Sequence, residues 1–232
     1  MLDRWAWVRR WLRGPGVRTL DAGAGNGGFA MYAAKRGNET VGLSFSQEEV
    51  CNASRRAALL QLQDVRFQVG DLRQLDEFAG ELGSFDQILC LEVAEHIRDD
   101  AKLLCDLARM LRPGGRLLLT TPNAAHRALW SETLSHEEDG GHVRWGYDHD
   151  EMGRLFASAG LRVIAQEYVS GVVSQRLTNL MRRAQQVHVS LGWAVMMPLR
   201  PLQILDRPLS RLLHWQPLCI AVVGERAAVE LA

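Results

Sequence analysis

The stretch that decides the fold is Asp21-Ala22-Gly23-Ala24-Gly25-Asn26-Gly27-Gly28, which follows a short apolar run at residues 17–22 and precedes a helical pattern over 29–36. Glycines let the backbone approach a ligand closely, and the free N–H groups at a helix start face that ligand. A strand, a glycine-rich turn and a helix in this order predict a nucleotide-type binding crevice at the carboxyl end of a parallel strand.

The same alternation of strand and helix continues toward the C-terminus. The predicted strands after the first cover residues 40–45, 65–69, 85–91, 116–121, 161–168 and 218–224, and the predicted helices cover 3–13, 29–36, 47–62, 100–111 and 150–159. The run FDQILCL at 85–91 is almost continuously apolar, which is typical of a strand buried on both faces of a parallel sheet. The pattern predicts one α/β domain over residues 1–232 with a doubly wound, Rossmann-like, seven-stranded and mostly parallel sheet and helices on both faces.

The glycine motif has two interpretations. Gly23, Gly25 and Gly28 match the dinucleotide pattern G-x-G-x-x-G, which would indicate a nucleotide-binding oxidoreductase. That pattern requires an acidic residue about 20 positions further on for the ribose hydroxyls, and Ser44 stands there instead. The oxidoreductase interpretation therefore remains the alternative.

In the second interpretation the motif is D-x-G-x-G-x-G, and it is followed in order by Asp71 after the third strand, L-E-V-A-E-H at 91–96 and L-R-P-G-G at 111–115. This set, over residues 17–168, resembles the class I S-adenosylmethionine (SAM) methyltransferases. The resemblance implies a SAM-binding core in which Asp21 orients the ammonium group, Asp71 faces the adenine amino group and Ser44 replaces the usual ribose acid. The implied cofactor-binding residues are Asp21, Gly23, Ala24, Gly25, Gly27, Ser44, Phe45, Asp71, Leu72, Leu91 and Glu92.

Candidate catalytic residues lie in two segments. Glu92, Glu95 and His96 would share one face if a helix began there, and the similar ubiquinone-type O-methyltransferases have a divalent-metal role assigned to this stretch. The preferred alternative is that Glu92 contacts the cofactor while Glu95 and His96 brace the chain, so the metal question stays open. His142, in Gly140-Gly141-His142 of the long loop at 123–150, is the candidate general base because an imidazole titrates near neutral pH. The predicted catalytic residues are therefore His142, His96 and Glu95.

Residues 170–216 are predicted to form an apolar, helical, arginine-containing insertion before the last strand. It would act as a lid or acceptor pocket, a dimer face or a lipid contact, or simply pack against the sheet. Lys+Arg and Asp+Glu both number 27, so no net charge attracts nucleic acid. Four scattered cysteines and no long apolar run predict a cytoplasmic protein without a membrane span.

The predicted function is SAM-dependent methyl transfer to a small, apolar, lipid-like or natural-product acceptor, with O-methylation preferred over N- and C-methylation. S-adenosylhomocysteine would be the product. The alternatives are the oxidoreductase and a non-catalytic scaffold with the same fold.

Overall fold

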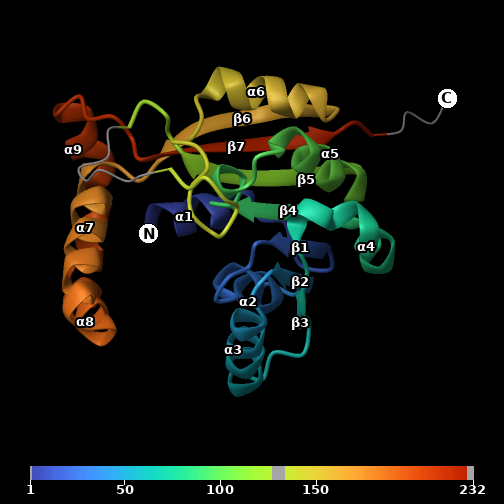
Figure 1. Cartoon of the computed structure of the whole chain (residues 1–232), viewed down its shortest axis with the longest axis horizontal. Helices are drawn as coiled ribbons and strands as arrows, with labels where there is room; N and C mark the ends of the chain where they lie inside the picture. The colour runs from blue at the N-terminus through green and yellow to red at the C-terminus, as the bar shows by residue number, and fades with distance from the viewer. Residues whose placement is uncertain (1, 127–133, 229–232) are drawn as a thin grey trace.

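Seven strands form one sheet in the computed structural model, which describes residues 2–126 and 134–228 (Figure 1). Their order is β3-β2-β1-β4-β5-β7-β6, and β7 runs antiparallel to both of its neighbours. The strands are β1 (Arg18–Ala22), β2 (Glu39–Ser44), β3 (Val65–Val69), β4 (Phe85–Leu91), β5 (Leu111–Pro122), β6 (Leu161–Val169) and β7 (Cys219–Arg226). The predicted seven-stranded, mostly parallel sheet is confirmed.

The strand order reverses between β1 and β4, which lie side by side at the centre of the sheet. Parallel sheets of this kind leave a crevice outside the carboxyl ends of the strands at such a reversal. The register pairs Asp21 with Gly42 of β2 and with Leu89 of β4, so the end of β1 opens into this crevice.

Helices cover both faces of the sheet, and each face has its own apolar core. One core joins Leu75, Leu104 and Phe156 to the sheet, and the other joins Trp7 and Ala33 to it. The helices are α1 (Leu2–Trp11), α2 (Gly28–Lys35), α3 (Gln47–Leu59), α4 (Leu75–Leu82), α5 (Asp100–Met110) and α6 (His149–Ser158), with short 3-10 turns η1 (Leu72–Gln74) and η2 (Ala94–His96).

The insertion before β7 is entirely helical and consists of α7 (Val172–Val187), α8 (Val189–Leu199), η3 (Arg200–Leu205) and α9 (Asp206–Leu212). Asp206, which is buried, accepts hydrogen bonds from the backbone N–H groups of Val173 (2.7 Å) and Ser174 (3.1 Å) and so satisfies the start of α7. Gly192 lets α8 pack closely on α7, since a Cβ there would stand 2.3 Å from Cγ of Gln185.

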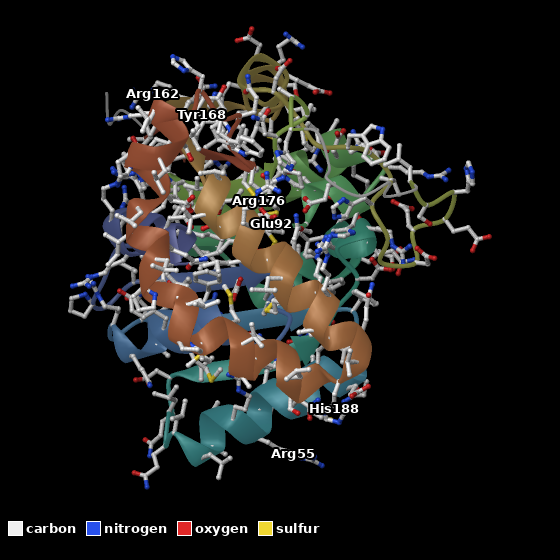
Figure 2. All side chains as sticks on the ribbon, turned by 90° about the vertical axis from the view of Figure 1, so that its left-hand side faces the viewer. Arg55, Glu92, Arg162, Tyr168, Arg176 and His188 are labelled. Carbon is white, nitrogen blue, oxygen red and sulfur yellow. The ribbon has the colours of Figure 1, made fainter. Side chains whose placement is uncertain are left out.

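The insertion lies on the side of the molecule to which the parallel strands point, at the left of Figure 1. Figure 2 looks onto that side and shows α7 and α8 crossing in front of the sheet. Among the helices in the described part of the chain, none is both long and apolar enough to cross a membrane.

Candidate functional site

The glycine-rich turn after β1 folds back onto β2 and β4. The N–H groups of Gly23 and Ala24 donate to the carbonyl oxygen of Leu43 at 3.1 and 2.6 Å. Gly23 has a φ of +84°, and a Cβ there would lie 2.4 Å from Cγ2 of Val93. Both the backbone conformation and the close approach therefore require glycine at this position.

A cavity of about 340 Å³ lies between this turn and the ends of β2, β3 and β4; we call it the glycine-turn cavity. Its lining includes seven of the residues predicted to bind a cofactor, namely Gly23, Gly25, Ser44, Phe45, Asp71, Leu72 and Glu92. It also includes residues that the sequence analysis missed, namely Glu49, Gly70, Arg73, Val93, Ile97, Glu138 and Gly140, together with the predicted catalytic residue His96. Four predicted residues, Asp21, Ala24, Gly27 and Leu91, are not part of this lining.

Asp21 lies beneath the turn and is almost completely buried, with 2% of its surface exposed. Burial raises the pKa of this carboxyl to about 7, against a smaller opposite effect of the Ala30 N–H. Its Oδ2 accepts no hydrogen bond from any group in the described part of the chain. A buried carboxylate oxygen without a hydrogen bond lowers the stability of the fold, so a hydrogen-bond donor from a ligand would be favourable at this position.

A carboxylate does reach the end of β2, but it comes from α3. Ser44 Oγ donates a 2.5 Å hydrogen bond to Oε2 of Glu49 and accepts one from the Ser46 N–H at 3.2 Å. Ser46 in turn caps α3 by accepting from the Glu49 N–H at 3.3 Å. The Ser-x-x-Glu spacing is a capping-box signal, which marked the helix start but not the direction of the Glu49 carboxylate.

Asp71 is held by the next turn of its own chain. Its carboxylate accepts from Nε of Arg73 at 2.9 Å and Nη2 at 2.6 Å, and this hydrogen bonding with Arg73 lowers the pKa of Asp71. Arg73 Nη1 also donates to the carbonyl oxygen of Glu138 at 3.2 Å. The loop after β5 is therefore tied to the wall of the glycine-turn cavity.

Glu92, Glu95 and His96 would share one face only if a helix began at Glu92, and no helix begins there. Glu92 adopts a left-handed backbone conformation (φ +59°), only a single 3-10 turn follows, and α5 begins at Asp100. Glu92 points toward α1, where its Oε2 pairs with Nη2 of Arg4 at 2.9 Å while Oε1 accepts from Thr120 Oγ1 at 3.0 Å.

Glu95, His96 and His142 do come together, and each places one potential ligand atom within 4.8 Å of the other two. His96 Nε2 lies 3.8 Å from Oε1 of Glu95, its Nδ1 lies 3.0 Å from the Gly141 carbonyl oxygen, and its ring lies 4.7 Å from that of His142. Glu95 is buried and accepts from Thr121 Oγ1 at 3.1 Å. Burial, reinforced by the Glu92 charge, raises the pKa of Glu95 to about 8.

This group can do two kinds of chemistry. Two imidazoles beside a carboxyl group can accept and relay a proton. Two imidazoles and a carboxylate are also a donor set that suits a divalent transition metal.

The other histidines of the long loop at 123–150 lie elsewhere. His126 Nε2 lies 2.7 Å from Nε2 of Gln175, and His149 Nε2 lies 3.1 Å from the carbonyl oxygen of Glu167. The His136 carbonyl accepts from Arg98. Residues 127–133 of this loop are outside the described residues.

A second, larger cavity of about 900 Å³ lies between α1, the end of β6, η3 and α9; we call it the side cavity. Trp7, Val169 and Trp215 contribute apolar surface to it. Gln203 is 3% exposed, and its Oε1 accepts from the Leu2 N–H at 2.8 Å while its Nε2 donates to no described group. The cavity therefore combines apolar walls with a buried amide donor.

The two cavities flank the first turn of α1. Asp3 lines the side cavity, whereas the next residue, Arg4, reaches Glu92 in the wall of the glycine-turn cavity.

Comparison with known proteins shows what this chain is similar to. The family model described as a methyltransferase domain matches residues 13–168. A ubiquinone biosynthesis O-methyltransferase from Xanthomonas axonopodis pv. citri is 28% identical over 83% of this chain and 81% of its own length. The enzyme of the same name from Aeromonas salmonicida is 30% identical over 75% of this chain and 74% of its own length.

Solved structures agree on the fold. The [4+2]-cyclase SpnF aligns with a TM-score of 0.68 at 19% identity, over 97% of this chain and 81% of that one. Magnesium protoporphyrin IX methyltransferase from Synechocystis, solved with bound S-adenosylhomocysteine, aligns with a TM-score of 0.59 at 16% identity, over 96% and 80% of the two chains.

Proposed function

The chain belongs to the class I SAM-dependent methyltransferases, and from this premise we propose that it methylates an oxygen atom of a small, apolar or lipid-like acceptor. The observation that carries the proposal is the His96–His142 pair beside the glycine-turn cavity, with the apolar side cavity across the first turn of α1. The curated relatives are named O-methyltransferases, which supports an oxygen acceptor. The oxidoreductase alternative gains no support from these matches.

The glycine-turn cavity fits SAM. Carboxylates of Glu49, Asp71, Glu92 and Glu138 line it beside one arginine, Arg73, so acidic side chains outnumber basic ones in the lining. This balance suits a ligand with a sulfonium and an ammonium group. The unsatisfied Oδ2 of Asp21 is the acceptor that a donor above the turn would meet, directly or through water. SAM, when bound, supplies an electrophilic methyl group. We keep the whole predicted set as cofactor-binding residues: Asp21, Gly23, Ala24, Gly25, Gly27, Ser44, Phe45, Asp71, Leu72, Leu91 and Glu92.

We add Glu49 to this set as the residue that binds the ribose hydroxyls. Ser44 cannot supply a charged, two-oxygen acceptor at the end of β2, but its hydroxyl holds the Glu49 carboxylate at that place. A carboxylate can accept from both hydroxyls of a ribose diol, as the acid at the strand end does in dinucleotide-binding folds. The acidic residue proposed for the ribose hydroxyls therefore lies five positions after the end of β2, where such a residue usually stands.

His142 is the proposed general base. It would take the proton of the acceptor hydroxyl, so that the oxygen could accept the methyl group that SAM would supply, with S-adenosylhomocysteine as the other product. His96, which is held by the Gly141 carbonyl and lies beside Glu95, positions the His142 ring. The raised pKa of Glu95 keeps its carboxyl group largely protonated at neutral pH.

The side cavity is the proposed site for the apolar part of the acceptor. Its walls are largely apolar, and its volume lies in the range of small-molecule sites. Gln203 Nε2 would donate to an oxygen of the acceptor.

A second role for Glu95, His96 and His142 is to hold a divalent cation, since their donor atoms fit such an ion. Turnover that survives exhaustive dialysis against EDTA would eliminate this role.

The described free cysteines, Cys51, Cys90, Cys105 and Cys219, support our placement of the protein in the cytoplasm.

The test is a methyl-transfer assay that follows S-adenosylhomocysteine formation from SAM, with a phenol, the same phenol bearing a long alkyl chain, and the corresponding alkylated aniline as acceptors. We expect turnover with the alkylated phenol at a lower KM than with the bare phenol. Equal KM values would contradict the apolar acceptor site, and preferred turnover of the aniline would contradict O-methylation. Binding of S-adenosylhomocysteine without turnover of any acceptor would favour the scaffold alternative.

A further inference from the structure

We propose that the outer surface of α8, η3 and α9 binds an anionic membrane surface; we call this surface the helical face. Large apolar side chains are exposed all along it, namely Leu191, Trp193, Met197, Leu202, Leu212 and Leu213. Leu212 is 73% exposed, Met197 55% and Trp193 49%. Isolated exposed apolar residues are ordinary, but a run of them over three consecutive helical elements marks an interaction surface.

The charge of this segment identifies the partner. Residues 189–213, which span the helical face, contain three arginines (Arg200, Arg207 and Arg211), no lysine, no glutamate and one aspartate, in a chain whose Lys+Arg and Asp+Glu totals are equal. The aspartate is Asp206, which is buried and accepts from the backbone at the start of α7. The segment thus presents positive charge and apolar side chains together, with no exposed acidic side chain among its described residues. That combination is typical of helices that lie in the interface of an anionic bilayer.

A second copy of this chain is a poorer partner for the same surface. In a two-fold symmetric dimer a surface patch meets its own copy, so the arginine-rich segments would face each other. An anionic bilayer has no such repulsion, because its headgroups pair with the arginines while the acyl region accepts Trp193 and the leucines.

The position of the helical face is consistent with this partner. The insertion stands on the side of the molecule to which the parallel strands point (Figure 1), and the elements α7, α8 and α9 are foremost when that side is viewed directly (Figure 2). Of the described elements, α7 and η3 are the ones that pack closely against α8, so its outer side is open. A bilayer can therefore reach this surface without rearrangement of the domain.

The experiment is co-sedimentation of the purified protein with vesicles of phosphatidylcholine alone and of equal parts phosphatidylcholine and phosphatidylglycerol. We expect binding to the anionic vesicles, weaker binding at high salt and little binding to phosphatidylcholine alone. Arg200→Gln should weaken partitioning about fivefold, and Leu212→Ser and Trp193→Ser should weaken it by at least as much.

Matched controls lie away from the helical face. Arg109→Gln removes an exposed arginine of α5, and Leu59→Ser removes a leucine that is 83% exposed at the end of α3. Both should bind vesicles like the wild type, and every variant should retain its affinity for S-adenosylhomocysteine, so the result is independent of the proposed acceptor.

Three outcomes would overturn the proposal. One is the absence of vesicle binding, and the second is equal binding to both kinds of vesicle. The third is a concentration-dependent dimer, seen by light scattering, that Leu212→Ser dissociates while vesicle binding is absent, which would assign the helical face to a second copy.

Discussion

Replacement of Glu49 by glutamine tests the arrangement at the end of β2. The Glu49 carboxylate is held by Ser44 Oγ at 2.5 Å and lines the glycine-turn cavity. A hydrogen bond to a charged acceptor contributes about 1.5–3 kcal/mol, whereas one to a neutral acceptor contributes about 0.5–1.5 kcal/mol. Glutamine keeps one carbonyl acceptor and loses the other, so two ribose hydroxyls would lose about 2 kcal/mol together. That loss corresponds to about 30-fold weaker binding.

The assay is calorimetric titration with S-adenosylhomocysteine at neutral pH. Glu48→Gln is the matched control, because both glutamates lie in the first turn of α3 and contribute equally to the charge at the helix N-terminus. Glu49→Gln should raise the Kd about 30-fold and Glu48→Gln less than twofold. A Kd for Glu49→Gln within twofold of the wild type would refute the ribose role. An equal loss of affinity in both variants would show that Glu49 acts only through the charge at the helix N-terminus.

Three further predictions address the turn, the base and the buried acid. Gly23→Ala should abolish measurable binding of S-adenosylhomocysteine, whereas Gly160→Ala, with a similar φ (+74°) but open space around its Cβ, should leave it intact; equal affinities would disprove the close approach at Gly23. His142→Ala should lower kcat by about 10²- to 10⁴-fold without changing the affinity for S-adenosylhomocysteine, and unchanged turnover would remove it as the base. Glu95→Gln should weaken the pH dependence of the free energy of unfolding, measured by urea denaturation. The folded state retains a proton on Glu95 that the unfolded chain releases above its ordinary pKa of 4.5, so wild-type stability should fall as pH rises from 4.5 to about 8, by at most about 4 kcal/mol. An identical slope in the variant would contradict the raised pKa.

The sheet could be predicted because its strands are short apolar runs separated by clear turn residues. β4 and β7 are buried along almost their whole length, and this burial is visible in the sequence as nearly continuous apolar runs. Helix α4 was missed, since its eight residues give an amphipathic pattern of little more than two turns, with Leu75 and Leu82 as the buried ends.

The site was less predictable because side-chain direction depends on backbone angles that the sequence does not reveal. The left-handed conformation at Glu92, a residue type that seldom adopts it, separates this carboxylate from Glu95 and His96. Glu49 was missed for a related reason, since an acidic residue for the ribose hydroxyls was expected only at the end of the strand. In the insertion, α8 and η3 were not predicted, because prolines usually interrupt a helix. Pro198 nevertheless lies in the last turn of α8, and Pro201 lies near the start of η3.

The loop after β5 links the two halves of the proposed reaction. Glu138 and Gly140 line the glycine-turn cavity, Arg73 joins the Glu138 carbonyl to Asp71, and the Gly141 carbonyl fixes His96. The Val143 N–H also donates to the Glu95 carbonyl oxygen at 2.9 Å. The loop residues that line the proposed adenine side of the glycine-turn cavity, Glu138 and Gly140, therefore lie within four residues of His142 in the sequence. A displacement of this loop would therefore disturb the proposed cofactor site and the proposed base together.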